Sequence, residues 1–600
     1  MIQADDHSVR QRSPSWWPAV ASVSRAEPRL AVTAVVTTFL SAAIPSVFIA
    51  LSGLAASLVS QDVPGNADRL GLVVAALALV LALSQLTSLV REGVIEAMAR
   101  QMDIVLRRRL VEAVARPVGV SHLEDAQMQS NIATAHGLAN RLGGPAGGLL
   151  GMTGRLQVLL TGAGCALLLA WVHPVLAVTL AALNLAVGWW LRREYHRLLH
   201  HLHLDPGVLR RGHYLRDVLL TPGAEKETRI FGLGPWFMNL HHAEWLRVAS
   251  AAWRDRRISW WKILAGAVIL GAAQAVAFAV LASGWQDGTV AVVGLVVGVQ
   301  ASLGLLHFAT VTEWDRLAHI GWEAVDALIE IEQAVRPRVP VGGRDPGEAP
   351  QREIEFRDVS FAYPGGTPVL HGISMTVPAG GSFAIVGRNG AGKSTLLKLL
   401  LRSYEPTSGE ILVDGVPLAQ VDPVRWRTRV STMAQDFVHL PLNMRENVTG
   451  PGHKPDEQAL AEVAAQSGLE SVLPDLPQGW ETILSRQLKG GTELSGGQWQ
   501  KVALARALYA LRTGARVLAL DEPTANMDIE SEREVYDAII DATRQHTLLL
   551  VSHRFATVRR VDHIVVLDGG RIIESGDHAG LMARRGMYAQ MFEAQAAIVR

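Results

Sequence analysis

Six long apolar stretches constrain this chain more than any other feature of its sequence. They are residues 30–51, 70–90, 156–172, 175–191, 263–282 and 289–310. None contains Asp, Glu, Lys or Arg, and about 20 apolar residues in a helix cross the roughly 30 Å of hydrocarbon in a bilayer. The third and fourth are short but can borrow neighbouring residues. Helices buried in a soluble domain are the alternative, but six such stretches within 310 residues predict a membrane domain.

The overall composition fits a membrane part joined to a soluble part. Hydrophobic residues make up 49% of the chain and charged residues 19%, and the mean hydropathy is +0.20. This balance is too apolar for an ordinary soluble enzyme or a disordered chain. The formal net charge of zero argues against nucleic acid as a main partner. The single cysteine, Cys165, excludes an intrachain disulfide framework and a zinc site built on paired cysteines.

The distribution of basic residues predicts the orientation. The loops 91–148 and 192–257 carry many arginines, whereas the opposite side offers only Arg69 beside short connectors. Positive loops stay in the cytoplasm, so we expect a multi-pass protein of the cell membrane with the long loops, both termini and the C-terminal half inside. The polar N-terminus lacks the hydrophobic core of a cleavable signal peptide. Its Trp16, Trp17 and Pro18 suit either an interfacial anchor or a frayed tail.

The two inner loops also predict the domain organisation. Each has about 60 residues with helical patterning, and about 30 residues per arm would rise about 45 Å, so we expect the spans to continue into the cytoplasm as paired helices. Proline and glycine crowd residues 336–350, and a strand pattern begins at residue 354. We therefore predict an interfacial segment at 1–29, a six-helix transmembrane domain at 30–336, a linker at 337–350 and an α/β domain at 351–600.

A phosphate-binding loop stands near the start of the second domain. The apolar run 382–386 predicts a buried parallel strand, and a helical run follows the loop. The loop itself is Gly387, Arg388, Asn389, Gly390, Ala391, Gly392, Lys393, Ser394 and Thr395. This is the G-x-x-x-x-G-K-[ST] pattern in its required strand–loop–helix context. Its glycines let backbone N–H groups surround phosphates, Lys393 reaches the β- and γ-phosphates, and the Ser394 hydroxyl binds Mg²⁺.

Two further motifs suit phosphoryl transfer. An apolar strand at 517–520 ends in Asp521, which can hold a metal shell, and Glu522, which can polarise the attacking water. A solvated turn is the alternative for this pair. Before them, a serine and two glycines at a helix start offer a second phosphate-binding terminus. That run is Leu494, Ser495, Gly496, Gly497 and Gln498.

Together these motifs resemble those of the ATP-binding cassette (ABC) transporters. The run 494–498 reads LSGGQ and ends 23 positions before Asp521 (521 − 498). Six spans, long inner loops and a C-terminal cassette resemble an exporter half-transporter. The resemblance implies a membrane all-α domain of six transmembrane helices with long cytoplasmic extensions, followed by an α/β P-loop ATPase domain with a helical subdomain. It also implies ATP and Mg²⁺ as cofactors.

The resemblance assigns roles to single residues. Tyr363 would stack on adenine, Gln435 would join Ser394 and Asp521 around Mg²⁺, and His553 would contact the γ-phosphate and act with Glu522 in catalysis. The LSGGQ run would bind the ATP held by the P-loop of a second chain. The loop 525–528 reads Ala-Asn-Met-Asp, where serine-alanine-leucine-aspartate is common in the family.

The same resemblance implies a partner and a class of cargo. One cassette and six spans imply pairing with a second half-transporter, as a homodimer or a heterodimer, and loop segments 121–135 and 223–237 occupy the positions of coupling helices. Spans without fixed charge suit hydrophobic or amphipathic cargo: a peptide, a drug-like natural product or a lipid. The stretch 493–500 resembles that of lantibiotic-type peptide exporters. The polar groups within the spans are Ser84, Gln85, Asn184, Gln274, Gln300 and His307.

Several alternatives stay open. A lipid flippase is one, and an ABC ATPase with a role outside transport is another, although six fused spans disfavour it. Importers of the family usually keep spans and cassette on separate chains, which disfavours an importer. A metal site is a rival interpretation of four histidines at helical spacing, but a solvated face fits them better because no carboxylate accompanies them before Asp205. They are His196, His200, His201 and His203.

Overall fold

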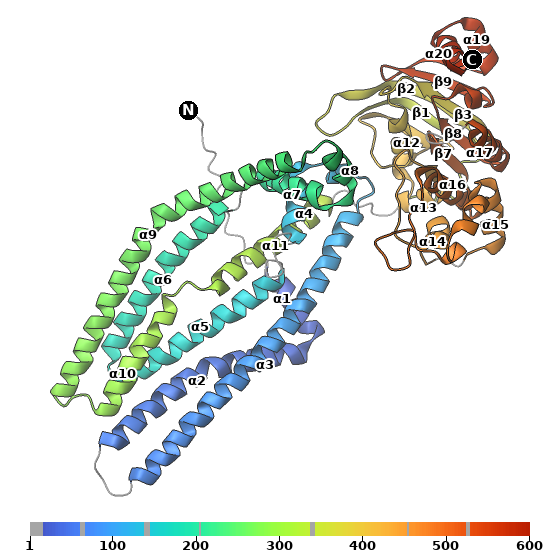
Figure 1. Ribbon diagram of the computed structural model, residues 1–600. Helices are drawn as coiled ribbons and strands as arrows, with labels where there is room; N and C mark the ends of the chain where they lie inside the picture. Colours follow the sequence, from blue (N-terminus) through green and yellow to red (C-terminus); the bar gives the residue numbers. More distant parts are fainter. Residues whose placement is uncertain are drawn as a thin grey trace, which may run out of the picture. The chain divides into compact units, whose positions relative to one another are not determined.

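The chain folds into two compact units (Figure 1). The computed structural model describes residues 16–60, 66–136, 145–202, 206–336, 343–452, 455–523 and 529–599. One unit comprises Met1–Ala115 and Gln127–Ala334, and the other comprises Arg116–Ala126 and Val335–Arg600. The expected interfacial segment before residue 16, the first part of the expected linker and the loop 525–528 lie outside the described residues.

The first unit is helical, as the sequence predicts. Its longest helices, α3 (Asn66–Ala115) and α9 (Gly234–Gln286), contain 50 and 53 residues. At 1.5 Å per residue each is about 75–80 Å long, far more than a bilayer requires. The spans therefore continue well beyond membrane depth. The remaining helices are α1 (Trp16–Ala26), α2 (Pro28–Ser60), α4 (Ala126–His136), α5 (Pro145–Val172), α6 (Pro174–Leu202), α7 (Pro206–Leu220), α8 (Pro222–Ile230), α10 (Val292–Gly304) and α11 (Glu313–Val335).

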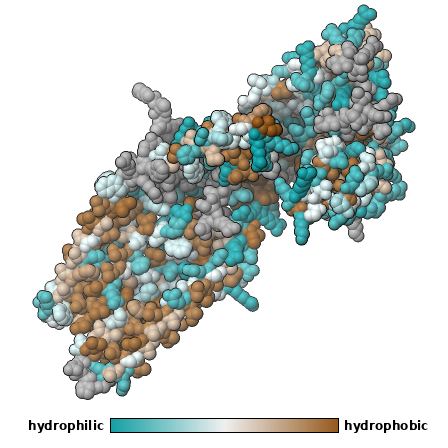
Figure 2. Space-filling view, in the orientation of Figure 1, coloured by the Kyte–Doolittle hydropathy of each residue, from teal (hydrophilic) through white to brown (hydrophobic). Residues whose placement is uncertain are grey.

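The surface of this unit is apolar along its long helices. Among the described residues, six helical segments are long and apolar enough to cross a membrane, and they overlap the six apolar stretches of the sequence. Large apolar side chains point outward along them, including Leu72, Leu89, Val268 and Val276, each more than 60% exposed. Figure 2 shows this apolar surface over the long helices. A bilayer satisfies such a surface, and with six membrane-crossing segments the chain is a multi-pass membrane protein.

The sixth span is interrupted, which the sequence does not predict. A 3₁₀ turn, η2 (Leu305–Phe308), follows α10, and α11 begins only after several non-helical residues. The carbonyl groups released by this break accept hydrogen bonds from neighbouring helices. Arg192 on α6 donates to the Phe308 oxygen at 3.0 Å, and Arg155 on α5 donates to the Thr310 oxygen at 3.4 Å. The break is thus stabilised by arginines distant in sequence, which supply the partners that a non-helical backbone needs near a membrane.

Glycines bring α5 into backbone contact with α11. A Cβ atom at Gly151 would lie 2.2 Å from the Ala318 nitrogen and 2.5 Å from the Trp314 oxygen. One at Gly154 would lie 2.4 Å from the Trp314 ring. Small residues permit such close approach in membrane proteins.

Replacing Gly151 with alanine should therefore destabilise the helical unit. The added methyl group meets backbone atoms that cannot rotate away, and overpacking of this kind costs about 1–3 kcal/mol. We expect a lower apparent melting temperature, measured as the surviving monodisperse fraction after heating in detergent. Gly271→Ala in α9 is the matched control, because no heavy atom lies within 4 Å of its Cβ position. Equal melting of the two variants would contradict the close contact.

The second unit contains two sheets. The six-stranded sheet has the order β10-β9-β3-β8-β7-β6, with parallel pairing from β9 to β6 and an antiparallel edge strand β10. The four-stranded sheet, β2-β1-β4-β5, is antiparallel. The strands are β1 (Glu353–Ala362), β2 (Pro368–Pro378), β3 (Ser382–Gly387), β4 (Ser408–Val413), β5 (Val416–Pro417), β6 (Val430–Met433), β7 (Val517–Asp521), β8 (Thr547–Val551), β9 (His563–Asp568) and β10 (Arg571–Gly576).

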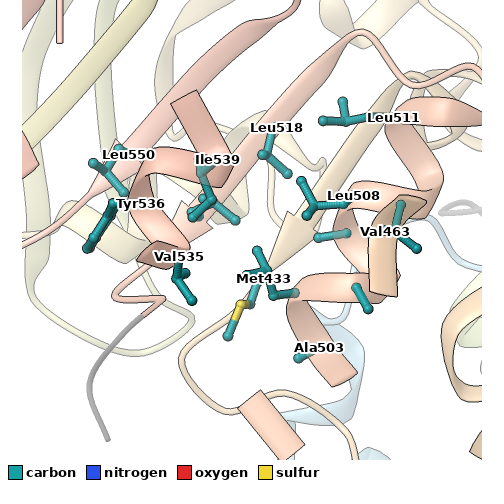
Figure 3. Close-up of a cluster of buried hydrophobic side chains, with 14 of the residues drawn as sticks. Met433, Val463, Ala503, Leu508, Leu511, Leu518, Val535, Tyr536, Ile539 and Leu550 are labelled. Carbon is teal, nitrogen blue, oxygen red and sulfur yellow. The ribbon is translucent and has the colours of Figure 1, made fainter. Parts of the chain in front are cut away.

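Both faces of the six-stranded sheet are buried, which explains its apolar strands. Leu518 and Leu550 belong to a core shared with helices, shown in Figure 3, whereas Ala519 and Leu549 belong to a second core shared with the smaller sheet. Strands covered on both faces lose the alternation of polar and apolar residues. The helices of this unit are α12 (Lys393–Leu400), α13 (Pro423–Arg429), α14 (Met444–Thr449), α15 (Glu457–Gln466), α16 (Gly496–Arg512), α17 (Ile529–Ala542), α18 (Phe555–Val558), α19 (His578–Arg584) and α20 (Met587–Val599).

Candidate nucleotide-binding site

The parallel sheet brings the sequence motifs to one edge. Strands β3, β8, β7 and β6 are neighbours, and their register pairs Ile385 with Val551, Val551 with Asp521 and Leu520 with Met433. Their carboxyl ends therefore lie side by side, which is where ligands bind in α/β sheets of this kind. The P-loop follows β3, the two carboxylates end β7, His553 follows β8 and Gln435 follows β6.

The P-loop has the open, glycine-dependent form that phosphate binding requires. Gly390 and Gly392 have φ angles of 81° and 103°, in the left-handed region that favours glycine. No heavy atom lies within 4 Å of the position of a Cβ at Gly390. Arg388, Asn389 and Gly390 are exposed at the loop tip, whereas Ala391 and Thr395 are buried beneath it. The loop thus presents backbone at the mouth of the site.

Lys393 anchors this loop from inside. Its Nζ donates to the carbonyl oxygens of Gly387 and Arg388, both at 3.0 Å. Burial lowers the pKa of Lys393, while the carboxylates of Glu522 and Asp521 act in the opposite direction. The ammonium group is therefore held against backbone, facing the acidic pair.

Ser394 and Asp521 supply the oxygen atoms suited to a hard cation. The Ser394 hydroxyl donates to the Asp521 carboxylate, and burial nevertheless raises the pKa of Asp521. Mg²⁺ in proteins is commonly held by one or two carboxylates together with substrate phosphates, so these two residues fit it. Gln435 is exposed just beyond β6 and adds an amide oxygen at the same edge. Among the residues that the structure describes, no group of three His, Cys, Asp or Glu side chains could hold a metal, and the side chains of the four clustered histidines lie outside that description.

Glu522 and His553 contact each other. The His553 Nδ1 lies 2.9 Å from the Glu522 Oε1, and the Glu522 side chain is only 14% exposed. Glu522 has a φ of 51°, and its backbone nitrogen donates to the Val551 oxygen at 2.9 Å. This unusual backbone turns the carboxylate off the end of β7, next to the histidine that follows β8.

Tyr363 is connected to the P-loop helix. Its hydroxyl shares a hydrogen bond with the Thr395 Oγ1 at 3.1 Å, and the Lys398 Nζ lies 5.4 Å from the centre of its ring. The ring is half-buried. A half-buried aromatic side chain at the margin of the P-loop is well placed for stacking on a base.

The LSGGQ run forms the N-terminus of α16. The Ser495 hydroxyl accepts from the Gln498 nitrogen at 3.3 Å, and the Gln498 Oε1 accepts from the Ser495 nitrogen at 2.9 Å, so the two form a capping box. Leu494 is buried, Gly497 is half-buried, and Ser495 and Gly496 are exposed. An open helix start with exposed small residues is suited to a phosphate supplied from outside the unit.

Sequence reasoning missed Gln500. Its side chain, 2% exposed, donates to the carbonyl oxygen of Pro523, directly after Glu522. A buried polar side chain needs such a partner. Gln500 therefore joins the LSGGQ helix to the acidic pair, a role that its place at the end of the stretch 493–500 did not indicate.

Replacing Lys393 with alanine should weaken nucleotide binding by about 10- to 100-fold. This is the effect expected when the charge-assisted hydrogen bonds from the ammonium group to phosphate are lost. Titration of the full chain with a fluorescent ATP analogue measures this. Lys393→Met is the matched control for packing, because it keeps an unbranched side chain in the buried position without the charge. We expect both variants to bind the ATP analogue weakly. Unchanged affinity would show that the loop 387–395 is a structural turn and not a phosphate-binding loop.

Part of the chain is similar to known proteins. Residues 370–525 match the family model described as ABC transporter. The "ATP-dependent lipid A-core flippase" of Saccharophagus degradans is 32% identical over 329 residues, which cover 55% of this chain and 54% of that protein. The protein of the same description from Paraburkholderia xenovorans is 38% identical over 263 residues, 43% of each chain. The chain thus spans about half the length, or less, of these relatives.

The fold comparison extends over nearly the whole chain. The solved "Structure of a bacterial Atm1-family ABC exporter with ATP bound" superposes with a TM-score of 0.76 at 25% identity, covering 95% of this chain and 99% of that one. The expected fold class is therefore confirmed. Together these findings identify residues 370–525 as an ABC transporter ATP-binding domain, joined to a helical domain with the architecture of an ABC exporter.

Proposed function

We propose that this chain is a half-transporter that uses ATP hydrolysis to export a hydrophobic or amphipathic substrate across the cytoplasmic membrane. The observation that carries the proposal is the meeting of the P-loop, Asp521, Glu522 and His553 at one edge of a sheet, in a chain with six membrane-crossing segments. Nucleotide chemistry and a membrane pathway thus occur in one polypeptide. The relatives named as flippases and the exporter of known structure support the same function.

In this proposal the chain's own residues hold and orient ATP. The P-loop from Gly387 to Thr395 surrounds the phosphates, Lys393 contacts them with its ammonium group, and Tyr363 stacks on the base. Glu522 accepts a proton from the attacking water, and His553, already in contact with that carboxylate, orients the site. Ser394, Asp521 and Gln435 would hold Mg²⁺, which when bound neutralises charge on the β- and γ-phosphates.

The proposed assembly is a dimer, with a homodimer favoured and a heterodimer as the alternative. Leu494, Ser495, Gly496, Gly497 and Gln498 of one chain would cover the ATP on the P-loop of the other. The proposed orientation places both termini and the ATP-binding domain in the cytoplasm. We retain the boundaries 1–29, 30–336, 337–350 and 351–600 as proposed domains, and segments 121–135 and 223–237 as proposed coupling elements. No role for nucleic acid is proposed.

The polar side chains of the spans give little guidance on cargo, since they are uncharged and several form hydrogen bonds within the helical unit. Gln274 donates to the Ser302 oxygen at 2.8 Å, Gln300 accepts from the Ser52 hydroxyl at 2.9 Å, and Asn184 donates to the Leu180 oxygen at 2.8 Å. The Asn184 Oδ1 and the Gln274 Oε1 accept no hydrogen bond among the described residues, but all three side chains are uncharged, so they add no charge that a ligand must match. Cargo recognised mainly by apolar surface is therefore favoured.

A lipid substrate is the second candidate, favoured by the relatives that are described as lipid A-core flippases. The two candidates differ in a single assay. Full-length protein is reconstituted in vesicles with a fluorescent phospholipid, and movement of the label between leaflets is followed with ATP. A parallel panel of amphipathic peptides and cationic dyes is scored for accumulation and for stimulation of ATP hydrolysis.

Vesicles that contain Glu522→Gln protein are the control, since they hold the same folded chain without turnover. ATP-dependent movement of lipid alone supports a flippase, and movement of peptides or dyes supports a broader exporter. ATP hydrolysis that no membrane component or compound alters, with no movement of any probe, would contradict both.

A further inference from the structure

A short segment of the first half of the chain belongs structurally to the ATP-binding unit. Residues Arg116–Ala126 join α3 to α4, and they group with the second unit. The Val120 nitrogen donates to the Ser403 oxygen at 2.9 Å, and Arg427 donates to the Val118 oxygen. A Cβ at Gly119 would lie 2.8 Å from the Ser403 oxygen. Backbone contacts therefore hold the segment closely against the second unit.

One side-chain contact in this seat differs from the others. The Tyr404 hydroxyl donates to the Glu124 carboxylate, while the Tyr404 ring is buried with 6% exposure. Burial, and next the hydrogen bond to Glu124, raise the pKa of Tyr404. The hydroxyl therefore keeps its proton and acts as a donor. It is the point at which a buried ring of the ATP-binding unit contacts a carboxylate of the segment.

The Tyr404 ring also contacts aromatic residues next to the nucleotide site. Its centre lies 5.1 Å from the centre of the Tyr363 ring at an interplanar angle of 84°, and 5.5 Å from that of Phe361 at 64°. Such edge-to-face pairs are attractive and depend on orientation. Tyr363 in turn shares its hydroxyl hydrogen bond with Thr395 in the first turn of α12. The contacts are continuous from Thr395 through Tyr363 and Tyr404 to Glu124.

We propose that Tyr404 is a positioning residue that links occupation of the base-binding face of Tyr363 to the seating of segment 116–126. The inference rests on the proposed ATP site. A base stacked on Tyr363 would fix the orientation of that ring. The Tyr363 ring in turn orients the Tyr404 ring, and the Tyr404 hydroxyl donates its hydrogen bond to Glu124. Since coupling is reciprocal, release of the segment must also weaken base binding. One edge-to-face ring pair corresponds to an effect of about 3- to 10-fold.

Hydrogen–deuterium exchange of the full chain in lipid nanodiscs tests this link. The protein carries Glu522→Gln, so that bound ATP is not consumed, and peptides covering 116–126 and 387–395 are followed. With ATP we expect slower exchange in both peptides, the first by about 3- to 10-fold. Inorganic tripolyphosphate, which offers phosphates without a base, should protect only the P-loop peptide.

Variants of the Tyr404–Glu124 hydrogen bond test whether the link passes through it. Tyr404→Phe keeps the ring and removes the hydroxyl, and Glu124→Gln removes the charged acceptor. Each should abolish most of the ATP-dependent protection of 116–126 while the P-loop peptide stays protected. The double variant should lose no more than either single variant, because both remove one interaction.

Arg427→Gln is the matched control for a structural role. Arg427 also contacts the segment, through the Val118 oxygen, but has no part in the ring contacts. We expect it to speed exchange of 116–126 equally with and without ATP. Unchanged ATP-dependent protection in Tyr404→Phe or Glu124→Gln would overturn the proposed link. Failure of ATP to protect 387–395 in the parent would instead overturn the proposed ATP site.

Discussion

Glu522→Gln should leave ATP binding intact and reduce the rate of phosphate release by at least about 100-fold, the typical contribution of a general base. Glutamine keeps the length and shape of the side chain and still accepts a hydrogen bond from His553 Nδ1, which lies 2.9 Å from Oε1 in the parent. Its amide cannot accept the proton of the attacking water. The chemical step should fail while the site remains assembled.

Two measurements on the same preparation separate these effects: equilibrium binding of a fluorescent ATP analogue and steady-state release of phosphate. His553→Gln serves as a comparison, because His553 touches Glu522 but is not the proposed base; its loss of rate should be smaller. Near-normal turnover of Glu522→Gln would show that another group activates the water.

Mixed dimers should regain ATPase activity that neither parent variant shows alone. One variant is Lys393→Ala, and the other is Gly496→Asp in the LSGGQ run. If each site combines the P-loop of one chain with the LSGGQ run of the other, one site of a mixed dimer receives both defects. The second site receives an intact P-loop and an intact LSGGQ run, and should hydrolyse ATP.

The structure favours Gly496 over its neighbour for this experiment. Ser495 caps α16 through its hydroxyl, so replacing it would also damage the helix start. No heavy atom lies within 4 Å of a Cβ at Gly496, so Gly496→Asp places a negative charge there without crowding. Gly496→Asn is the neutral control and should be less harmful.

Mixed dimers are isolated through two different affinity tags, and ATP occupancy is measured beside turnover. Activity that stays at background with no ATP retained would count against sites shared between chains. Retention of one ATP without turnover would show shared sites that must fire together.

Local motifs were the predictable part of this molecule. The apolar stretches, the strand before Gly387 and the strand ending at Asp521 each lie within one short run of sequence, and the fold has helices and strands there. Their meeting also follows from sequence, since parallel strands carry their following loops to one edge.

Features created by contacts between distant residues were not predictable. The break in the sixth span depends on Arg155 and Arg192, which belong to two other helices. The positive φ of Glu522 arises where β7 ends beside Val551. Periodicity indicates which face of its own helix or strand a residue occupies, but it does not identify the distant residue that contacts it.

The contacts of residues 116–126 with the second unit affect any study of the ATP-binding part as a separate fragment. A protein that begins at residue 335 omits this segment, although it continues the second unit in space. The Ser403 carbonyl, the Tyr404 hydroxyl and the Arg427 guanidinium would then lose the partners that this segment supplies. Water would replace those partners, and the edge of a buried aromatic cluster would become surface. Kinetic constants measured on such a fragment would describe a unit that lacks these contacts, and not the intact chain.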